Sequence, residues 1–182
     1  MSSQGTEIEK KVYAAVLEDN TIYILDAEDV QPLLDRGYGE KDHGRIELSP
    51  YEALYLISEG WLSIQMKSAT LDFAELLNHF RRSNPTIWAR FMVYRDLRER
   101  GYIVKSGFGL GVDFRVYERG AYGEQPAKFI VYGVFEGEPM SINTLLNSVN
   151  SAQNLKKEMI LGVIERRGEI VYYGVNSMTE IS

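Results

Sequence analysis

The sequence predicts an α/β (α+β) protein with two parts. A small N-terminal mixed α/β domain is expected over residues 1–85, and a C-terminal domain over residues 86–182 with a mixed sheet flanked by helices. Three observations predict this arrangement. Runs of β-branched and aromatic residues near both ends are typical of strands, and apolar residues spaced three and four apart in the middle are typical of helices. Asn84-Pro85 interrupts the chain between the two parts.

The chain begins with two strand patterns. Residues 11–17 and 21–25 are rich in β-branched and aromatic side chains, and the acidic segment 18–20 separates them. This pattern predicts a hairpin with an acidic turn. Residues 26–36 could form a short helix, and the polar, glycine-rich residues 37–45 predict a loop after it.

A helix start follows at Ser49-Pro50. Serine is a favoured N-cap, proline fits the first helical position, and Glu52 lies three residues after Ser49, as in a capping box. Gly60 then predicts the end of this helix. Residues 61–64 have a short strand pattern, and residues 73–80 have the apolar spacing of another amphipathic helix.

The C-terminal part begins with a helix that is expected over residues 86–100 and ends at Gly101. Several strands follow it, with one long polar helix among them, and this mixture predicts a mixed sheet packed by helices. The strands are expected at residues 102–105, 113–117, 128–135, 159–164 and 169–175, and the polar helix at 141–157.

The charge of the chain excludes one broad class of function. Lys and Arg number 20 against 26 Asp and Glu, giving a net charge of −6. Residues 1–90 hold 9 basic and 15 acidic residues, while residues 91–182 hold 11 of each. A nucleic-acid binder that acts alone usually carries a broad basic surface. Any contact with RNA would therefore use a local patch or a basic partner.

The composition also limits cofactors and location. Hydrophobic residues make up 45% and charged residues 25%, which is ordinary for a globular protein. Cysteine is absent and only His43 and His79 are present, so neither a disulfide framework nor a zinc site is expected. No apolar run approaches the ~20 residues of a membrane span. We expect a cytoplasmic protein without membrane contact, metal or cofactor.

Several residues have ordinary interpretations when they are considered alone. Tyr117 would be a strand aromatic, Pro126 a proline at a strand edge, and Lys156-Lys157 cations that suit a helix C-terminus. The glycine-rich residues 107–111 lack the Lys-Ser/Thr pair of a phosphate-binding loop, so we expect a turn between strands.

A longer pattern is more specific. Residues 94–107, which lead to Asp113-Phe114-Arg115-Val116-Tyr117, strongly resemble the catalytic domain of the archaeal tRNA-intron splicing endonuclease family. Further segments that resemble this family are residues 48–56, 127–131, 155–164 and 168–173, so that the resemblance spans roughly residues 46–175.

The resemblance implies a metal-independent cleavage of RNA. In such a reaction the ribose 2′-hydroxyl attacks the adjacent phosphate and leaves 2′,3′-cyclic phosphate and 5′-hydroxyl ends. The step needs a base, an acid and a cation beside the phosphate. The family is thought to use a tyrosine, a histidine and a lysine. Tyr117 and Lys157 match the tyrosine and the lysine, but Pro126 stands where the histidine is expected.

Two departures indicate a structural, non-catalytic subunit of the heteromeric type. Proline cannot transfer a proton, and loss of a proton-transfer residue costs roughly 10²–10⁴ in rate. The family often has an arginine seven residues before the lysine to hold a flipped base, and this chain has Asn150 there. The chain would then support a separate catalytic subunit in a heterotetramer that excises introns from precursor tRNA.

The resemblance also implies two kinds of subunit contact. The final strand would pair with its equivalent in another subunit, which suits a segment that is apolar on both sides. The acidic residues Glu165 and Glu169 would insert into a basic pocket of the catalytic subunit. The strand residues expected at the interface are Ile170, Val171, Tyr172 and Tyr173.

Two alternatives remain open at this point. The chain could be an active tRNA-intron endonuclease in which Tyr117 and Lys157 work with water or with a residue of a partner. It could also be an RNA-binding relative without a role in splicing.

Overall fold

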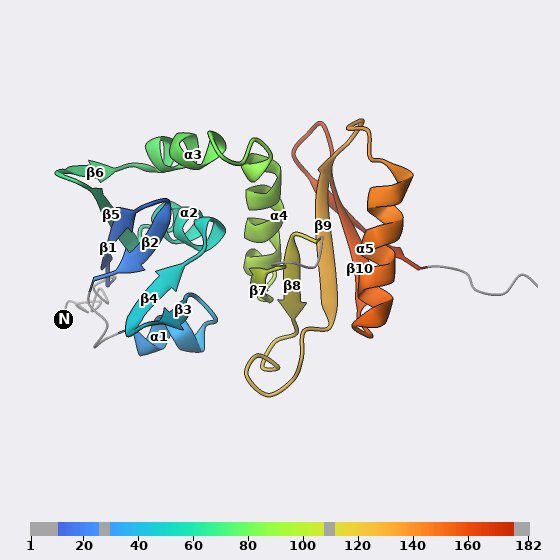
Figure 1. Ribbon diagram of the computed structural model, residues 1–182, viewed down its shortest axis with the longest axis horizontal. Helices are drawn as coiled ribbons and strands as arrows, with labels where there is room; N and C mark the ends of the chain where they lie inside the picture. Colours follow the sequence, from blue (N-terminus) through green and yellow to red (C-terminus); the bar gives the residue numbers. More distant parts are fainter. Residues whose placement is uncertain (1–10, 26–29, 108–111, 177–182) are drawn as a thin grey trace, which may run out of the picture.

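The computed structural model describes residues 11–25, 30–107 and 112–176. They form two mixed sheets with five helices among these residues (Figure 1). The N-terminal sheet has the order β3-β4-β2-β1-β5-β6, and the C-terminal sheet has the order β11-β10-β9-β8-β7. In chain order the elements are β1 (Tyr13–Glu18), β2 (Thr21–Ile24), α1 (Gln31–Asp35), β3 (Glu40–Asp42), β4 (Arg45–Leu48), α2 (Pro50–Ser58), β5 (Leu62–Met66), β6 (Ala69–Leu71), α3 (Phe73–Arg81), α4 (Ile87–Glu99), β7 (Ile103–Ser106), β8 (Phe114–Tyr117), β9 (Phe129–Phe135), α5 (Ile142–Asn154), β10 (Glu158–Ile164) and β11 (Ile170–Val175).

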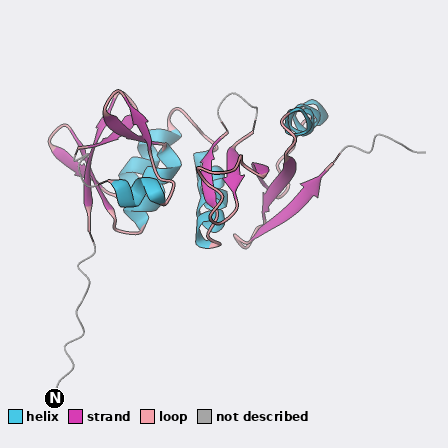
Figure 2. Ribbon diagram, turned by 90° about the horizontal axis from the view of Figure 1, so that it is seen from below, coloured by secondary structure: helices cyan, strands magenta, loops and turns pink. Residues whose placement is uncertain are grey.

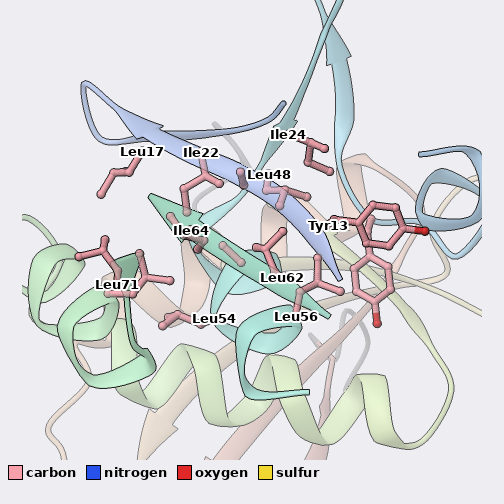
Figure 3. Packing of buried hydrophobic residues seen from close by; sticks show 14 of the residues in the cluster. Tyr13, Leu17, Ile22, Ile24, Leu48, Leu54, Leu56, Leu62, Ile64 and Leu71 are labelled. Carbon is pink, nitrogen blue, oxygen red and sulfur yellow. The ribbon is translucent and has the colours of Figure 1, made fainter. Parts of the chain in front are cut away.

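The N-terminal hairpin is confirmed. Strands β1 and β2 pair antiparallel, and Asp19 and Asn20 between them have φ values of 44° and 71°. Asp and Asn adopt positive φ more readily than most residues, so they suit a two-residue turn. Strand β1 also pairs parallel with β5, which places it inside the sheet. Its apolar side chains pack with those of α2 and β5 in one hydrophobic cluster (Figure 3).

Parts of the predicted N-terminal pattern are wrong. The predicted loop at residues 37–45 contains β3 and the first residue of β4, which form a hairpin around His43-Gly44. Strand β6 was not predicted, because three residues are too few to show an alternating pattern. Helix α1 is only five residues long, and residues 26–29 of the predicted helix lie outside the described residues.

The two helices that follow begin as their sequences predict. Ser49 accepts a hydrogen bond from the backbone N–H of Glu52, and the Glu52 carboxylate accepts one from the N–H of Ser49. This reciprocal pair confirms the capping box of α2. Asp72 and Glu75 form the same device at the start of α3.

Helices α4 and α5 pack on opposite faces of the C-terminal sheet (Figures 1 and 2). Strands β9 and β10 are parallel, and the other neighbouring pairs are antiparallel. A mixed sheet flanked by helices is therefore confirmed. Helix α5 ends at Asn154, three residues before the predicted end at Lys157. Of the predicted glycine-rich turn, residues 108–111 lie outside the described part of the chain.

A buried ion pair joins the two parts of the molecule. Lys105 of β7 donates to the Glu52 carboxylate of α2 at 2.9 Å, and both side chains are only 3% exposed. Lys105 also donates to the backbone carbonyl of Gly39 at 3.0 Å, and the Glu52 carboxylate accepts from the N–H of Gly39. We call these residues, Gly39, Glu52 and Lys105, the junction cluster. They connect α2 and the residue before β3 to β7 of the C-terminal sheet.

Aromatic rings fill the space beside the junction cluster. Tyr94 of α4 is fully buried, and its ring lies 6.2 Å from that of Tyr51 and 6.0 Å from that of Tyr55. Phe114 of β8 also packs in this group, with its ring centroid 5.1 Å from that of Tyr51. The aromatic rings of α2 therefore pack directly on elements of the C-terminal part.

Among the described helices, none combines the length and hydropathy that crossing a bilayer would need.

Candidate functional site

A polar cavity of about 460 Å³ lies at one end of the C-terminal sheet. Its walls come from the segment between β8 and β9, the turn between α5 and β10, and the first residue of β10. The lining residues are Glu118, Ala121, Gln125, Pro126, Ala127, Lys128, Lys156, Lys157 and Glu158. The structure therefore brings together two of the positions singled out from the sequence, Pro126 and Lys157.

Lys157 is held by the turn that ends α5. The backbone of Lys156 has a φ of 54°, and the N–H of Lys157 donates to the carbonyl of Ala152 at 2.9 Å. The Lys157 ammonium group donates to the carbonyl oxygen of Ala127. The cation is thus fixed beside the residue that follows Pro126. Lys157 lies beyond the helix, so the expected position at a helix end is corrected to a position in the following turn.

Tyr117 lies beside the cavity. It is the last residue of β8 and is half-buried, and its ring packs edge-on against Tyr122 with 5.0 Å between centroids. The next residue, Glu118, contributes to the cavity wall, whereas Tyr117 is outside the set of lining residues. The structure therefore places Lys157 in the cavity wall and Tyr117 next to a residue of that wall.

Pro126 is exposed and lines the cavity next to Ala127, whose carbonyl group accepts the Lys157 hydrogen bond. Its side chain can neither donate nor accept a proton. The two histidines of the chain belong to the N-terminal part. His43 lies in the turn between β3 and β4, and His79 on α3 is hydrogen-bonded to Asn20 at 3.0 Å. Neither histidine is among the residues that line the cavity.

The titratable groups in the cavity wall are carboxylates and ammonium groups. Glu118 and Lys128 form an ion pair at 2.7 Å, with about half of each side chain exposed. The hydrogen bond to Glu118 raises the pKa of Lys128 above its usual value, so this lysine stays protonated at neutral pH. The cavity can therefore hold an anion with ammonium groups. The imidazole that would exchange protons near neutral pH is absent from its lining.

Asn150 lies on an exposed part of α5. It offers an amide where the resemblance implies a cationic side chain. An amide can donate hydrogen bonds to a base edge but has no positive charge to place over its ring.

The loop of Glu165 to Glu169 is a tight turn between β10 and β11. The N–H of Glu165 donates to the carbonyl of Glu169, and the N–H of Gly168 donates to the carbonyl of Glu165, both at 2.8 Å. Glu165 is half-buried, while Glu169 and the arginines between them are exposed. This geometry lets the loop present charges of both signs to solvent.

Strand β11 is an edge strand, and its four predicted interface residues divide between its two faces. Ile170 and Tyr172 turn toward the α4 side and pack in the core. The Tyr172 hydroxyl donates to the Asp96 carboxylate at 2.7 Å, and burial together with this carboxylate raises the pKa of Tyr172 well above its usual range. By the alternation of the strand, Val171 and Tyr173 turn to the other face, where Tyr173 is 52% exposed.

Sequence reasoning missed part of the surface around Tyr173. Strand register aligns Tyr132, Leu161 and Tyr173 in one row across β9, β10 and β11, and Val134, Val163 and Val171 in the next row. All six side chains are half-buried or exposed, although α5 covers the row before them. We call these six residues the apolar sheet face. The alternation of these residues within β9 and β10 is visible in the sequence. Only the pairing of the strands shows that they form one surface.

Comparison with known proteins covers both parts of the chain. Residues 87–172 match the family model described as tRNA intron endonuclease, catalytic C-terminal domain, and residues 13–77 match tRNA intron endonuclease, N-terminal domain. A tRNA-splicing endonuclease of Methanococcus maripaludis is 34% identical over 91% of this chain and 94% of its own length. That of Pyrococcus abyssi is 31% identical over 91% and 96%. A match to the tRNA-splicing endonuclease of Methanosarcina acetivorans, 35% identical, covers 82% of this chain but 43% of that longer protein.

Proposed function

The chain belongs to the tRNA intron endonuclease family, and we propose that it serves there as a structural subunit that supports a separate catalytic subunit. One observation carries this proposal. At the cavity where Lys157 is anchored, the residue beside Ala127 is Pro126, and neither histidine of the chain lines the cavity. Lys157 supplies a cation at the cavity. An imidazole group, which is best suited to proton transfer near neutral pH, is absent from the cavity lining.

The substrate of the complex would be precursor tRNA, cut without a metal ion or cofactor. The acidic balance of the chain agrees with a role beside a basic partner, because a polyanion is attracted by cationic surfaces. Three ammonium groups, on Lys128, Lys156 and Lys157, still line the cavity, although Lys128 is paired with Glu118. We expect any RNA contact of this chain to be weak and to depend on the catalytic subunit.

Self-association would use the edge strand β11 and the apolar sheet face. The backbone of an edge strand has unpaired N–H and C=O groups on one side, which can pair with another strand. The half-exposed row of Tyr132, Leu161 and Tyr173 gives the second copy an apolar surface to cover. Val171→Arg with Tyr173→Glu should shift the chain to a smaller species in sedimentation velocity. An unchanged species would exclude this surface.

Contact with the catalytic subunit would use Glu165 and Glu169, which flank the tight turn between β10 and β11. Insertion of these carboxylates into a basic pocket would give charge-assisted hydrogen bonds. Reversing both residues to lysine should weaken the mixed complex by a factor of roughly 10 or more, as for truncation of buried charged contacts at interfaces. If the doubly reversed chain assembles normally, this contact is wrong.

A second function is favoured by one feature of the cavity. Glu118 and Glu158 line it together with Lys157, and a carboxylic acid can act as a general acid or base. In that case the chain would be an active metal-independent endonuclease that uses Tyr117 and Lys157, with a glutamate as the proton donor. Cleavage by the isolated chain that is abolished by Glu118→Gln or Glu158→Gln would establish this alternative.

The deciding experiment is cleavage of an intron-containing precursor tRNA with a bulge-helix-bulge, in the presence of a metal chelator. The purified chain is tested alone and mixed with a family member from the same cell that carries the histidine. The proposal expects cleavage only in the mixture. Cleavage by the chain alone that Lys157→Ala abolishes would overturn it.

A further inference from the structure

Residues 118–128, which join β8 to β9, form one wall of the polar cavity. We call them the cavity segment. Its backbone folds back on itself, because the N–H of Ala121 donates to the carbonyl of Glu118 at 3.1 Å and the N–H of Gln125 donates to the carbonyl of Ala121 at 2.8 Å. These turns are local. They shape the segment, but they do not determine where it lies relative to Lys157 on the opposite wall.

Arg119 anchors the cavity segment on the end of α4. Its guanidinium group donates a hydrogen bond to the backbone carbonyl of Arg100, the residue that caps α4. A cation at a helix C-terminus is favoured by the helix dipole, and it satisfies a carbonyl that has no partner within the helix. The same guanidinium lies against Gly101, where a Cβ atom would be 2.6 Å from Nε of Arg119. Gly101 has a φ of 87°, so glycine both allows the turn and leaves room for Arg119.

Tyr122 anchors the same segment near its middle. Its half-buried ring packs edge-on against Tyr117 with 5.0 Å between centroids. The ammonium group of Lys105 lies 5.9 Å from the centroid of the Tyr122 ring, within the roughly 6 Å range of a cation–π contact. Because Lys105 is also bonded to Glu52 of α2, the ring lies beside the junction cluster. The cavity segment is thus attached to β8 and β7 through one aromatic side chain.

The cavity segment in turn holds Lys157. The carbonyl of Ala127, near the end of the segment, accepts the hydrogen bond of the Lys157 ammonium group. Ala127 is buried, whereas Pro126 before it is exposed at the cavity. A displacement of the segment would therefore move residue 126 and the acceptor of Lys157 together.

We propose that Arg119 and Tyr122 are positioning residues of the candidate functional site. They fix the cavity segment on the end of α4 and on Tyr117, and through Ala127 they hold the Lys157 ammonium group in the cavity wall. Neither side chain is among the residues that line the cavity, so both act through the segment rather than on a ligand. The inference is independent of whether the chain is a structural subunit or an active endonuclease, because the same wall and the same cation belong to either.

The test measures how fast an amine-acylating reagent labels Lys157 relative to Lys67, an exposed lysine in the turn between β5 and β6, by mass spectrometry of the full chain after digestion. Arg119→Met removes the hydrogen bond but keeps the aliphatic stem, and it should raise the ratio of Lys157 to Lys67 labelling by about threefold to tenfold. Tyr122→Ser should raise it by about twofold to tenfold, as expected for the loss of an aromatic pair. The conservative variants Arg119→Lys and Tyr122→Phe should restore most of the protection, because the first can still donate to a carbonyl and the second keeps the ring.

Gly101→Ala is an independent test, because its Cβ atom would occupy the space of the Arg119 guanidinium group. The matched control is Gly137→Ala, since Gly137 has a φ of 80° and a Cβ atom there would meet nothing within 4 Å. Both variants carry the strain of a positive φ and should lose stability in thermal melting. Only Gly101→Ala should speed the labelling of Lys157 and the amide hydrogen exchange of residues 118–128.

All rates are measured at a temperature where every variant is folded. Unchanged labelling of Lys157 and unchanged exchange of the cavity segment in Arg119→Met, Tyr122→Ser and Gly101→Ala would overturn the proposal. An equal increase at every lysine would contradict it as well, because it would show a general loss of stability instead of a displacement of the cavity segment.

Discussion

Lys105 and Lys157 show the same side chain in opposite settings. Lys105 is 3% exposed and gives hydrogen bonds to a carboxylate and a carbonyl group in the junction cluster. Lys157 lies in the wall of an open cavity, where its hydrogen-bond acceptor is the Ala127 carbonyl. A buried cation needs its partners in order to exist in the fold, whereas an ammonium group at an open cavity remains available to an anion. The first lysine is therefore structural, and we propose that the second belongs to the candidate functional site.

The largest expected effect comes from breaking the junction cluster. Lys105→Met would leave the Glu52 carboxylate buried without its cation, and the free energy of unfolding should fall by about 3–5 kcal/mol. Urea denaturation measures this change. The matched control is Lys128→Met, which removes an ion pair with Glu118 that is about half exposed. The free energy of unfolding of that variant should fall by less than about 1 kcal/mol. Equal losses in the two variants would contradict the distinction between a buried and an exposed lysine.

A histidine at position 126 tests the candidate site that contains Lys157. Pro126→His would place an imidazole beside the Ala127 carbonyl that anchors Lys157. Because a general acid or base contributes roughly 10²–10⁴ in rate, cleavage of precursor tRNA by the variant should exceed that of the wild-type chain by about 10² or more. Single-turnover cleavage with chelator present measures it. A variant as inactive as the wild type would show that Pro126 is not the main defect.

The aromatic rings beside the junction cluster predict an alkaline weakening of the fold. Burial, and next the neighbouring Tyr38, raise the pKa of Tyr55 from 10.0 to about 12. Between these values the folded state holds more protons than the unfolded state, so stability is fully present below pH 10 and falls as the pH rises toward 12. Urea denaturation at several pH values should show this fall. Tyr55→Phe should make the fall shallower, and an unchanged slope would rule out this residue as a contributor.

The smallest effect on stability is expected for the replacement of Lys157, which lines the polar cavity. Lys157→Ala removes one hydrogen bond to the Ala127 carbonyl in a half-buried setting. The free energy of unfolding should change by no more than about 1 kcal/mol. Thermal melting of this variant beside Lys105→Met compares the two lysines directly. A loss as large as that of Lys105→Met would mean that Lys157 is a structural residue as well.

Local patterns in the sequence predicted most of the fold. The hairpin of β1 and β2 and the capping box at Ser49 and Glu52 are formed by residues close in the chain, so they are visible without the structure. Strand β6 was missed because short strands depend on their neighbours for stability. The burial of Lys105 was also missed, because its partner Glu52 is 53 residues away and strand alternation alone gives no sign of it.

The candidate site could be predicted only through the family resemblance. Tyr117, Pro126 and Lys157 belong to three separate segments, and no local spacing relates them. Their proximity depends on the order of β8, β9 and β10 in the sheet. The division of Tyr172 and Tyr173 between two faces needed the register of β11, which also showed that Tyr172 is anchored to Asp96.

We propose that the reaction takes place in the partner and that the cavity of this chain is vestigial. The most direct test mixes this chain with the histidine-bearing family member and follows single-turnover cleavage of a precursor tRNA. Lys157→Ala is placed in this chain in one mixture, and the matching lysine of the partner is changed to alanine in the other. We expect that only the change in the partner abolishes cleavage. Loss of cleavage with Lys157→Ala in this chain would contradict it.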